Sequence, residues 1–238
     1  MTGHAFVAGA TGYTGRAVVR ELVARGVPTV AHVRSDSPRL SEWRRRFAAL
    51  GATVDASPWQ TDALRTALTA TAPNLVFALL GTTRGRTRRA AAAGRDSSYQ
   101  AVDYGLSHLL LDVTRAASPA ARFIYLSSLG VSPRTTNEYL AVRWRIEQEL
   151  RSSGLDFLIA RPSFITGPDR EEVRVLERAA AGLVDGALRI GGWLGGAALR
   201  DQFASLTGDQ LGRALVVAAL TPGLARQTLD TRALRKLA

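Results

Sequence analysis

Hydrophobic positions along the chain switch repeatedly between two periods, and this alternation predicts strands and helices in turn. Short apolar runs with the length and residue types of buried strands lie at 6–8, 29–33, 52–56, 74–80, 123–126 and 157–160. Between these runs, apolar residues recur at the three- and four-residue intervals of a helix face around 18–23, 43–50, 64–68, 102–113 and 146–150. Alternating strands and helices form a parallel sheet with right-handed crossovers. The sequence therefore predicts an α/β fold with a doubly wound parallel sheet.

The regular alternation ends after Pro162. Residues 163–205 combine a predicted charged helix around 169–181 with a glycine-rich stretch at 191–196, and a last helix is predicted at about 209–220. The chain contains no internal repeat and no linker long enough to separate two domains. We predict a single domain over residues 1–238, in which 163–205 form a small, partly irregular C-terminal segment that covers the substrate.

Glycines recur every third residue directly between the first predicted strand and the first helix. Gly9 allows a tight turn, Gly12 lets the backbone approach a diphosphate, and Gly15 lets helix and strand pack closely. The amide groups at the helix start then face the phosphates, so a dinucleotide-binding Rossmann-type turn is favoured over an ordinary glycine turn. The residues expected to contact the dinucleotide here are Gly9, Thr11, Gly12, Tyr13, Thr14 and Gly15.

Arg34 follows the second predicted strand, where an NAD-binding site usually carries an acidic residue for the ribose 2′-hydroxyl. An arginine suits a 2′-phosphate, so NADP(H) is the predicted cofactor and NAD is less favoured. Two alternatives stay open at this position. Asp36 is the acceptor for the ribose in one of them, and Arg34 is an ordinary surface residue of an arginine-rich chain in the other.

The amino-acid composition excludes several kinds of chemistry and of site. The chain is 46% hydrophobic and 21% charged, which is typical of a folded globular protein. Cysteine is absent, which excludes disulfides and thiolate nucleophiles, and the three histidines lack metal-ligand spacing, so no metal site is predicted. No apolar stretch of about 18 residues or basic leader is present, so we expect a cytoplasmic protein without a membrane partner.

The net charge of +11 raises the question of an anionic partner. The arginines of the chain are scattered, apart from 44–46 and 84–95, and they are not interleaved with aromatic residues. A solvated surface is therefore favoured over a nucleic-acid interface. A small-molecule substrate is the expected partner. A protein partner and a homo-oligomer stay open.

Five short motifs occur in order, and together they resemble an atypical short-chain dehydrogenase/reductase of the NAD(P)-binding, NmrA-like group. The likeness covers about residues 4–220 and rests on the segments 9–15, 80–84, 102–104, 125–128 and 161–163. The resemblance implies that Gly81, Thr82 and Thr83 line the cofactor. It also implies that Pro162 and Ser163 lie near the nicotinamide.

The family pairs a catalytic tyrosine with a lysine four residues later and a serine at the end of the fifth strand. The matching positions here are Tyr139, Arg143 and Ser128, with Ser127 as the alternative serine. A spacing of four places Tyr139 and Arg143 on one helix face, so that their side chains can meet. The resemblance implies that both also bind the cofactor. A tyrosine is a poor acid or base at neutral pH unless a nearby cation favours its phenolate form, and arginine supplies that charge. Because a guanidinium does not pass on a proton as an ammonium does, this departure puts turnover in doubt more than binding.

These observations lead to three hypotheses. The first is an enzyme, an NADP(H)-dependent oxidoreductase acting on a carbonyl or alcohol group of a small molecule. The second is an NADP(H)-binding, redox-sensing regulatory protein without turnover, as some NmrA-like proteins are. The third is an isomerase or epimerase acting on a nucleotide sugar, and it is disfavoured because only about 75 residues follow Pro162.

Overall fold

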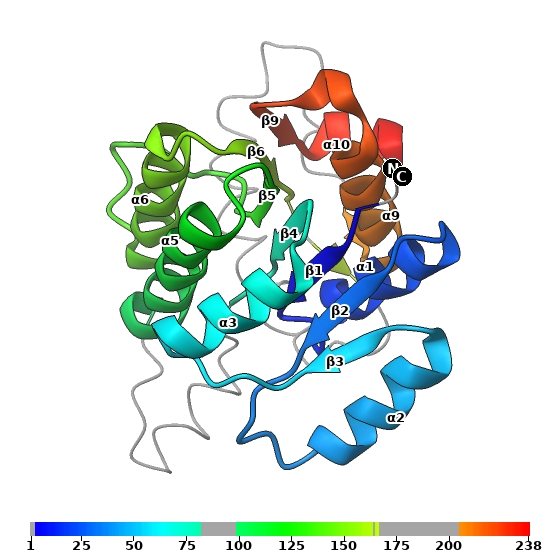
Figure 1. The fold of residues 1–238 in the computed structure, drawn as a ribbon. Helices are drawn as coiled ribbons and strands as arrows, with labels where there is room; N and C mark the ends of the chain where they lie inside the picture. The colour runs from blue at the N-terminus through cyan, green and yellow to red at the C-terminus, as the bar shows by residue number, and fades with distance from the viewer. Residues whose placement is uncertain (1–2, 82–98, 164, 167–204) are drawn as a thin grey trace.

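A computed structural model describes residues 3–81, 99–163, 165–166 and 205–238 (Figure 1). Its centre is a seven-stranded sheet with the order β3-β2-β1-β4-β5-β6-β9, in which every pair of neighbours is parallel. The strands are β1 (Ala5–Ala8), β2 (Thr29–His32), β3 (Thr53–Asp55), β4 (Leu75–Ala78), β5 (Arg122–Leu126), β6 (Asp156–Arg161) and β9 (Gln227–Asp230). The predicted doubly wound, Rossmann-type α/β fold is confirmed.

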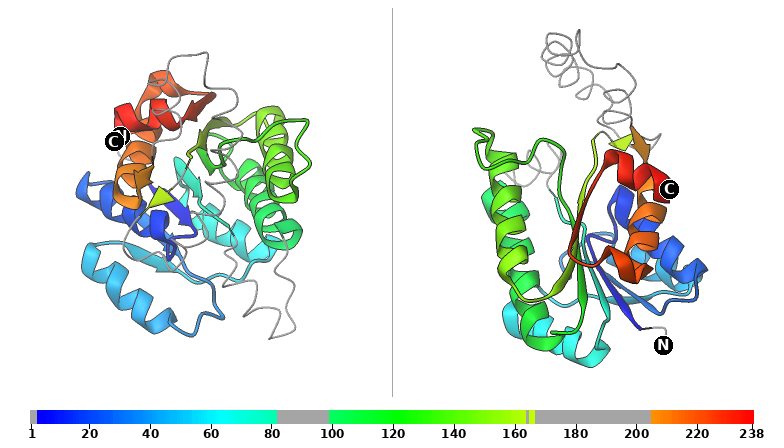
Figure 2. Two further views of the ribbon diagram at one scale, coloured as in Figure 1. Left: turned by 180° about the vertical axis from the view of Figure 1, so that it is seen from behind. Right: turned by 90° about the horizontal axis from the view of Figure 1, so that it is seen from above.

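Helices cover both faces of this sheet (Figure 2). One layer contains α1 (Tyr13–Ala24), α2 (Leu40–Leu50), α9 (Gly208–Leu220) and α10 (Thr231–Leu237). The other contains α3 (Thr61–Thr71), α5 (Ser107–Ala117) and α6 (Glu138–Ser152). A π-helical stretch, η1 (Tyr99–Leu106), leads directly into α5, and a 3₁₀ turn, η2 (Pro222–Leu224), follows α9.

Continuous apolar runs mark the central strands β1, β2, β4, β5 and β6 because these strands are buried on both faces. Along β1, Phe6 packs in the hydrophobic cluster beneath α3 and α5, whereas Val7 packs in the cluster beneath α1 and α9. In β5, Phe123 and Ile124 divide between the same two clusters. A strand with one wet face would instead alternate apolar and polar residues. The two clusters fix the sheet between the helical layers.

The strand order reverses at β1, which lies between β2 and β4. A crevice at the carboxyl ends of the strands opens at such a reversal, and ligands of open α/β sheets bind there. Gly9 leaves the end of β1 and Leu79 leaves the end of β4 at this point. The fold therefore places the glycine-rich turn at the position where a dinucleotide is expected.

The C-terminal elements β9 and α10 were not predicted from the sequence. β9 joins the sheet edge next to β6, and α10 follows it. A separate two-stranded ladder pairs β7 (Ile165–Thr166) with β8 (Leu206–Thr207). The predicted substrate-covering segment lies almost wholly outside the described residues, so it stays a prediction, as does the single-domain organisation.

Candidate functional site

The glycine-rich turn is so tightly packed that side chains are excluded from it. Gly9 has a φ of +81°, in the left-handed region that favours glycine, and a Cβ there would lie 2.4 Å from the carbonyl oxygen of Leu79. A Cβ on Gly15 would lie only 2.1 Å from the carbonyl oxygen of Gly9. The N–H of Gly12 donates to that same oxygen at 2.9 Å and closes the turn. The glycine spacing is thus required by the close approach of β1, β4 and α1.

The N-terminus of α1 suits an anion. Its N-cap residue, Gly12, provides no side-chain hydrogen bond, and the first turn contains no acidic residue. The first backbone N–H groups of a helix have no partner within the helix, and the helix dipole favours negative charge near them. Thr14 and Gly15 are buried, while Thr11 and Gly12 are half-buried beside this end. A diphosphate therefore fits the turn both sterically and electrostatically.

Tyr13 is oriented by packing. Its hydroxyl donates to the carbonyl oxygen of Thr166 at 3.1 Å, and its ring lies against Gly208, where a Cβ would be 2.4 Å from a ring carbon. Tyr13 therefore links α1 to β7 and α9 through its side chain. Its predicted contact with the cofactor stays a prediction.

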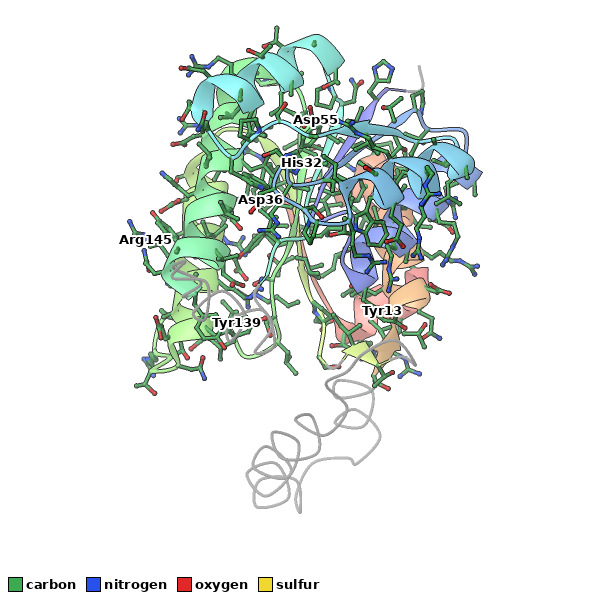
Figure 3. All side chains as sticks on the ribbon, turned by 90° about the horizontal axis from the view of Figure 1, so that it is seen from below. Tyr13, His32, Asp36, Asp55, Tyr139 and Arg145 are labelled. Atoms are coloured by element: carbon green, nitrogen blue, oxygen red, sulfur yellow. The ribbon has the colours of Figure 1, made fainter. Side chains whose placement is uncertain are left out.

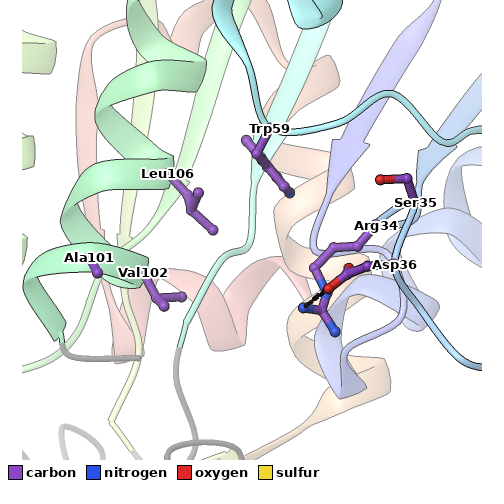
Figure 4. A pocket seen from close by; sticks show the side chains of 7 residues that line it. All are labelled: Arg34, Ser35, Asp36, Trp59, Ala101, Val102 and Leu106. Atoms are coloured by element: carbon purple, nitrogen blue, oxygen red, sulfur yellow. Dashed lines mark hydrogen bonds and ion pairs between the residues drawn. The ribbon is translucent and has the colours of Figure 1, made fainter. Parts of the chain in front are cut away.

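A cavity of about 340 Å³ opens beside the end of β2 (Figure 4). Its walls come from three places: the segment after β2, the loop after β3, and η1. The lining residues are Arg34, Ser35, Asp36, Trp59, Ala101, Val102 and Leu106. A flat apolar wall beside an exposed cation suits an aromatic base with an attached anionic group.

Arg34 and Asp36 face one another at the rim of this cavity. Nη1 of Arg34 lies 3.5 Å from the carboxylate of Asp36, and both side chains are about half exposed. An ion pair of this length and exposure is weak, so the guanidinium can turn towards another anion. The arrangement leaves both readings of this position open, with Arg34 as the phosphate ligand or Asp36 as the ribose ligand.

His32 packs against Trp59, one of the residues that line the cavity. Its ring lies edge-on to Trp59, with ring centroids 4.9 Å apart, and its Nε2 is 2.9 Å from the carbonyl oxygen of Ser57. His32 is buried, and its Nε2 lies 3.7 Å from the carboxylate of Asp55, which Figure 3 labels beside it. Burial lowers the pKa of His32, against the opposing effects of the Ser57 carbonyl and Asp55. A neutral imidazole therefore holds the loop that presents Trp59.

Arg143 is the most strongly held of the predicted catalytic residues. It is buried, its Nη2 donates to the carboxylate of Asp103 at 2.9 Å, and its Nη1 donates to the carbonyl oxygen of Leu126. The guanidinium carbon lies 4.5 Å from the ring centroid of Tyr139. A Cβ on Gly81 would lie 3.3 Å from Nη2. The structure thus brings together three of the predicted site residues and adds Asp103.

The charge of Arg143 is retained in this setting. Burial, the largest influence, lowers the pKa of Arg143, but Tyr139, Tyr125 and Asp103 together raise it above its ordinary value. Burial also raises the pKa of Tyr125, which lies beneath Arg143 in the core. Arg143 is therefore a permanent cation beside the Tyr139 ring.

Tyr139 lies at the start of α6 and is half-buried. The ring of Tyr99 from η1 packs edge-on against it, with ring centroids 5.3 Å apart. In Figure 3, Tyr139 and Tyr13 lie in opposite helical layers at the same end of the molecule. The tyrosine is therefore held between η1 and Arg143 at the end of the molecule where the glycine-rich turn begins α1.

The two candidate serines have different environments. The hydroxyl of Ser127 is buried and donates to Glu147 at 2.6 Å, whereas the half-buried Ser128 donates to the carbonyl oxygen of Leu129 at 3.2 Å. The Ser127 hydroxyl is thus occupied by a structural hydrogen bond to Glu147. Ser128 stays the candidate for contact with a substrate oxygen.

The remaining predicted residues follow β4 and β6. The carbonyl oxygen of Pro162 accepts from the N–H of Leu129 at 2.9 Å, and the N–H of Ser163 donates to the hydroxyl of Thr231 at 2.9 Å. These bonds fix the end of β6 between the loop after β5 and α10. Thr82 and Thr83 lie outside the described residues.

Three charged residues of this region were not predicted as site residues: Asp103, Glu147 and Arg161. Asp103 lies in one of the motifs that carry the family resemblance, and Glu147 follows Arg143 by one further four-residue step on the same helix face. An acidic residue on the apolar face of a predicted helix is itself a signal, because buried carboxylates require partners. That signal was present in the sequence at both positions.

Within the described residues, no helix has the length and apolar character needed to cross a bilayer. Over the same part of the chain, His, Asp and Glu side chains form no cluster of three or more that could hold a metal ion.

Comparison with known proteins shows the family. A protein-family model described as NAD(P)H-binding matches residues 9–186. The protein fmp52-1, mitochondrial, from Aspergillus terreus is 34% identical over 178 residues, which are 72% of this chain and 70% of that protein.

Two solved structures have the same fold. AtPrR2 with NADP⁺ and (+)pinoresinol superposes with a TM-score of 0.66 at 14% identity, covering 98% of this chain and 74% of that one. MoeE5 in complex with UDP-glucose and NAD superposes with a TM-score of 0.63 at 19% identity, covering 95% and 74%.

These comparisons correct one expectation. The prediction of a cytoplasmic protein is contradicted, because the related Aspergillus proteins are named as mitochondrial. That prediction rested on the lack of a long apolar stretch and of a basic leader, which does not specify a compartment.

Proposed function

The chain belongs to the NAD(P)H-binding family, and from this premise we propose that it is an NADP(H)-dependent oxidoreductase of the atypical short-chain dehydrogenase/reductase type. Its substrate is a small molecule with a carbonyl or alcohol group. The observation that carries this proposal is the stacking of Tyr139 on the buried Arg143 guanidinium, 4.5 Å away, beside Gly81. A tyrosine next to a fixed cation is suited to proton transfer.

The cofactor is held by this chain in two places. The amide groups of the turn from Gly9 to Gly15 bind the diphosphate, and the cavity beside Trp59 takes the adenosine end. When bound, NADPH supplies a hydride to the substrate carbonyl. Pro162 and Ser163, at the end of β6, would line the nicotinamide part of the site.

Tyr139, Ser128 and Arg143 have different roles at the substrate carbonyl. The Tyr139 hydroxyl gives its proton to the substrate oxygen during reduction and takes it back during oxidation. The Ser128 hydroxyl donates a hydrogen bond to the same oxygen and orients it. Arg143 stays protonated throughout and stabilises the phenolate that remains when Tyr139 has lost its proton.

NADP(H) is proposed over NAD(H) because Arg34 is the cation at the rim of the adenosine cavity. Its weak pairing with Asp36 at 3.5 Å leaves it able to bind a 2′-phosphate. Asp36 in turn repels a 2′-phosphate and attracts ribose hydroxyls. The balance between these two side chains sets the preference.

The test is consumption of NADPH with a panel of aldehydes, ketones and quinones, in the wild-type protein and in Tyr139→Phe. Tyr104→Phe is the matched control, because Tyr104 is also half-buried but bonds Glu149 on the outer side of α6. We expect turnover in the wild-type and Tyr104→Phe proteins and its loss in Tyr139→Phe. Equal turnover in all three would remove Tyr139 from the mechanism.

One observation favours a second candidate function, an NADP(H)-binding regulatory protein without turnover. The Arg143 guanidinium is held by Asp103 and the Leu126 carbonyl, and it cannot pass on a proton as a lysine ammonium can. Calorimetry would then show tight NADPH binding without turnover on any member of the panel, and a protein partner would be recovered differently with oxidised and reduced cofactor. Binding that does not distinguish the two redox states would exclude this function.

A further inference from the structure

Glu147 is a buried carboxylate with three hydrogen bonds to two strand ends. Its Oε1 accepts from the Ser127 hydroxyl at 2.6 Å and from Nε of Arg161 at 2.9 Å, and its Oε2 accepts from Nη2 of Arg161. The Glu147 side chain is fully buried, and that of Arg161 is about a quarter exposed. We call Glu147, Ser127 and Arg161 the Glu147 network.

The network joins three elements that carry the proposed site. Glu147 belongs to α6, Ser127 follows β5 directly, and Arg161 is the last residue of β6. The same two strand ends are tied by the backbone bond from Ser127 N–H to the Ala160 carbonyl at 2.8 Å. The network therefore fixes a helix against the carboxyl edge of the sheet.

The face of α6 that bears Glu147 also bears the proposed catalytic residues. Tyr139, Arg143 and Glu147 follow one another at four-residue steps, so their side chains lie along one side of the helix. Arg143 bonds the carbonyl oxygen of Leu126, the residue before Ser127. A rotation or slide of α6 would thus break the Glu147 and Arg143 contacts together.

A carboxylate in this setting permits little movement. A buried charge is tolerated only where its partners satisfy it, and the paired N–H groups of an arginine bind a carboxylate in one planar orientation. A neutral apolar residue would pack in the same space without a preferred orientation. The ionic network fixes the rotation of α6 about its own axis and its position along that axis. In return, the charge of Glu147 must be removed from water.

From this geometry we propose that Glu147 is a positioning residue for the nicotinamide half of the cofactor site. Through Ser127 and Arg161 it sets the placement of α6, and thereby keeps the Arg143 guanidinium against the Leu126 carbonyl and beneath Tyr139. Glu147 itself touches neither cofactor nor substrate. The inference rests on the proposed function, because it takes Tyr139 and Arg143 as the groups that face the nicotinamide ribose.

The experiment compares two ligands in the full chain. Affinities for NADPH and for adenosine 2′,5′-bisphosphate, which lacks the nicotinamide half, are measured by calorimetry in the wild type, Glu147→Gln and Glu149→Gln. Glu149 is the matched control, since it lies on the same helix but pairs with His108 and Arg145 at the surface. We expect Glu147→Gln to weaken NADPH binding about tenfold while the bisphosphate binds as before. Glu149→Gln leaves both affinities unchanged.

Two results would overturn the proposal. If Glu147→Gln binds NADPH as the wild type does, the network does not position the site. If both ligands lose affinity equally, Glu147 supports the whole fold and not the nicotinamide half. Failure of the wild type to bind NADPH would instead refute the proposed function. The failure of the Glu147 proposal and the failure of the proposed function can therefore be distinguished.

A second variant covers the case in which Glu147→Gln does not fold. Ser127→Ala removes one neutral donor and leaves the Arg161 ion pair in place, so the same selective loss of NADPH affinity is expected at smaller size. Arg161→Lys keeps the charge but loses the paired geometry, and we expect it to recover only part of the affinity that Arg161→Gln loses. Wild-type affinity in Arg161→Lys would contradict the geometric argument, and an unchanged affinity in Ser127→Ala would contradict its extension to Ser127.

Discussion

A methyl group added at Gly15 tests the packing of the glycine-rich turn. The Cβ of Gly15→Ala would lie 2.1 Å from the carbonyl oxygen of Gly9 and 2.8 Å from the Cα of Ala10. Both are backbone atoms, so no flexible side chain can move aside, and the turn or α1 must shift. Helix propensity acts in the opposite direction, because alanine inside a helix is favoured over glycine by about 1 kcal/mol.

The steric effect is expected to prevail. Overpacking a well-filled site costs about 1–3 kcal/mol, and this contact is closer than a side-chain clash that rotamers can relieve. At the upper end of that range, subtracting the gain in helix propensity leaves a net loss of about 2 kcal/mol. Such a loss would lower the melting temperature of a domain of this size by about 4–8 °C. A shift of the turn would also move the amide groups proposed to bind the diphosphate, so NADPH affinity should fall by about tenfold or more.

The assay is urea denaturation followed by circular dichroism, with NADPH binding measured by fluorescence. Gly223→Ala is the control, because a Cβ at Gly223 has no heavy atom within 4 Å. We expect that control to change the free energy of unfolding by a few tenths of a kcal/mol at most. A Gly15→Ala protein as stable as the wild type, or more stable, would refute the reasoning, since helix propensity would then outweigh the contact.

Three further predictions address single side chains. Arg34→Ala should weaken NADPH binding about tenfold and leave NADH binding unchanged in calorimetry, because only NADPH offers a 2′-phosphate; equal losses would place Arg34 outside the phosphate site. Asp103→Ala should lower the free energy of unfolding by about 3–5 kcal/mol in urea, because it leaves the Arg143 charge buried and unpaired; the exposed control Asp112→Ala should cost at most about 1 kcal/mol, and similar losses in both would contradict the buried-pair argument. Burial lowers the folded-state pKa of His32 below its ordinary 6.5, so its contribution to stability is complete above that value and declines as the pH falls towards the folded pKa. Urea titrations at roughly pH 7.5 and 5.5 should therefore show a larger loss of stability in the wild type than in His32→Asn, and parallel losses would contradict the assignment.

The central strands could be predicted because burial on both faces leaves an unbroken apolar run. Phe6 and Val7 in β1, or Phe123 and Ile124 in β5, point to opposite helical layers and are all buried. β9 gave no such signal, since Leu229 is its one buried residue. An edge strand with so little burial is recognised only from the unpaired edge of β6 that it covers.

The candidate site was predictable where one element carries it. The four-residue step from Tyr139 to Arg143 predicted their meeting, because both lie on one helix. Their partners come from elsewhere: Asp103 lies 40 residues before Arg143, and Ser127 lies 20 residues before Glu147. Sequence spacing cannot specify contacts between separate elements, which depend on the tertiary packing of η1, β5 and α6.

The order of the strands has a consequence for synthesis. β6 pairs with β9, which is encoded some 70 residues later, so the edge of β6 stays open while the intervening chain is being made. An unpaired parallel edge with apolar side chains is a template for association between nascent copies. Ribosome-bound intermediates that have released β6 but not β9 should be the stage at which this protein most needs a chaperone.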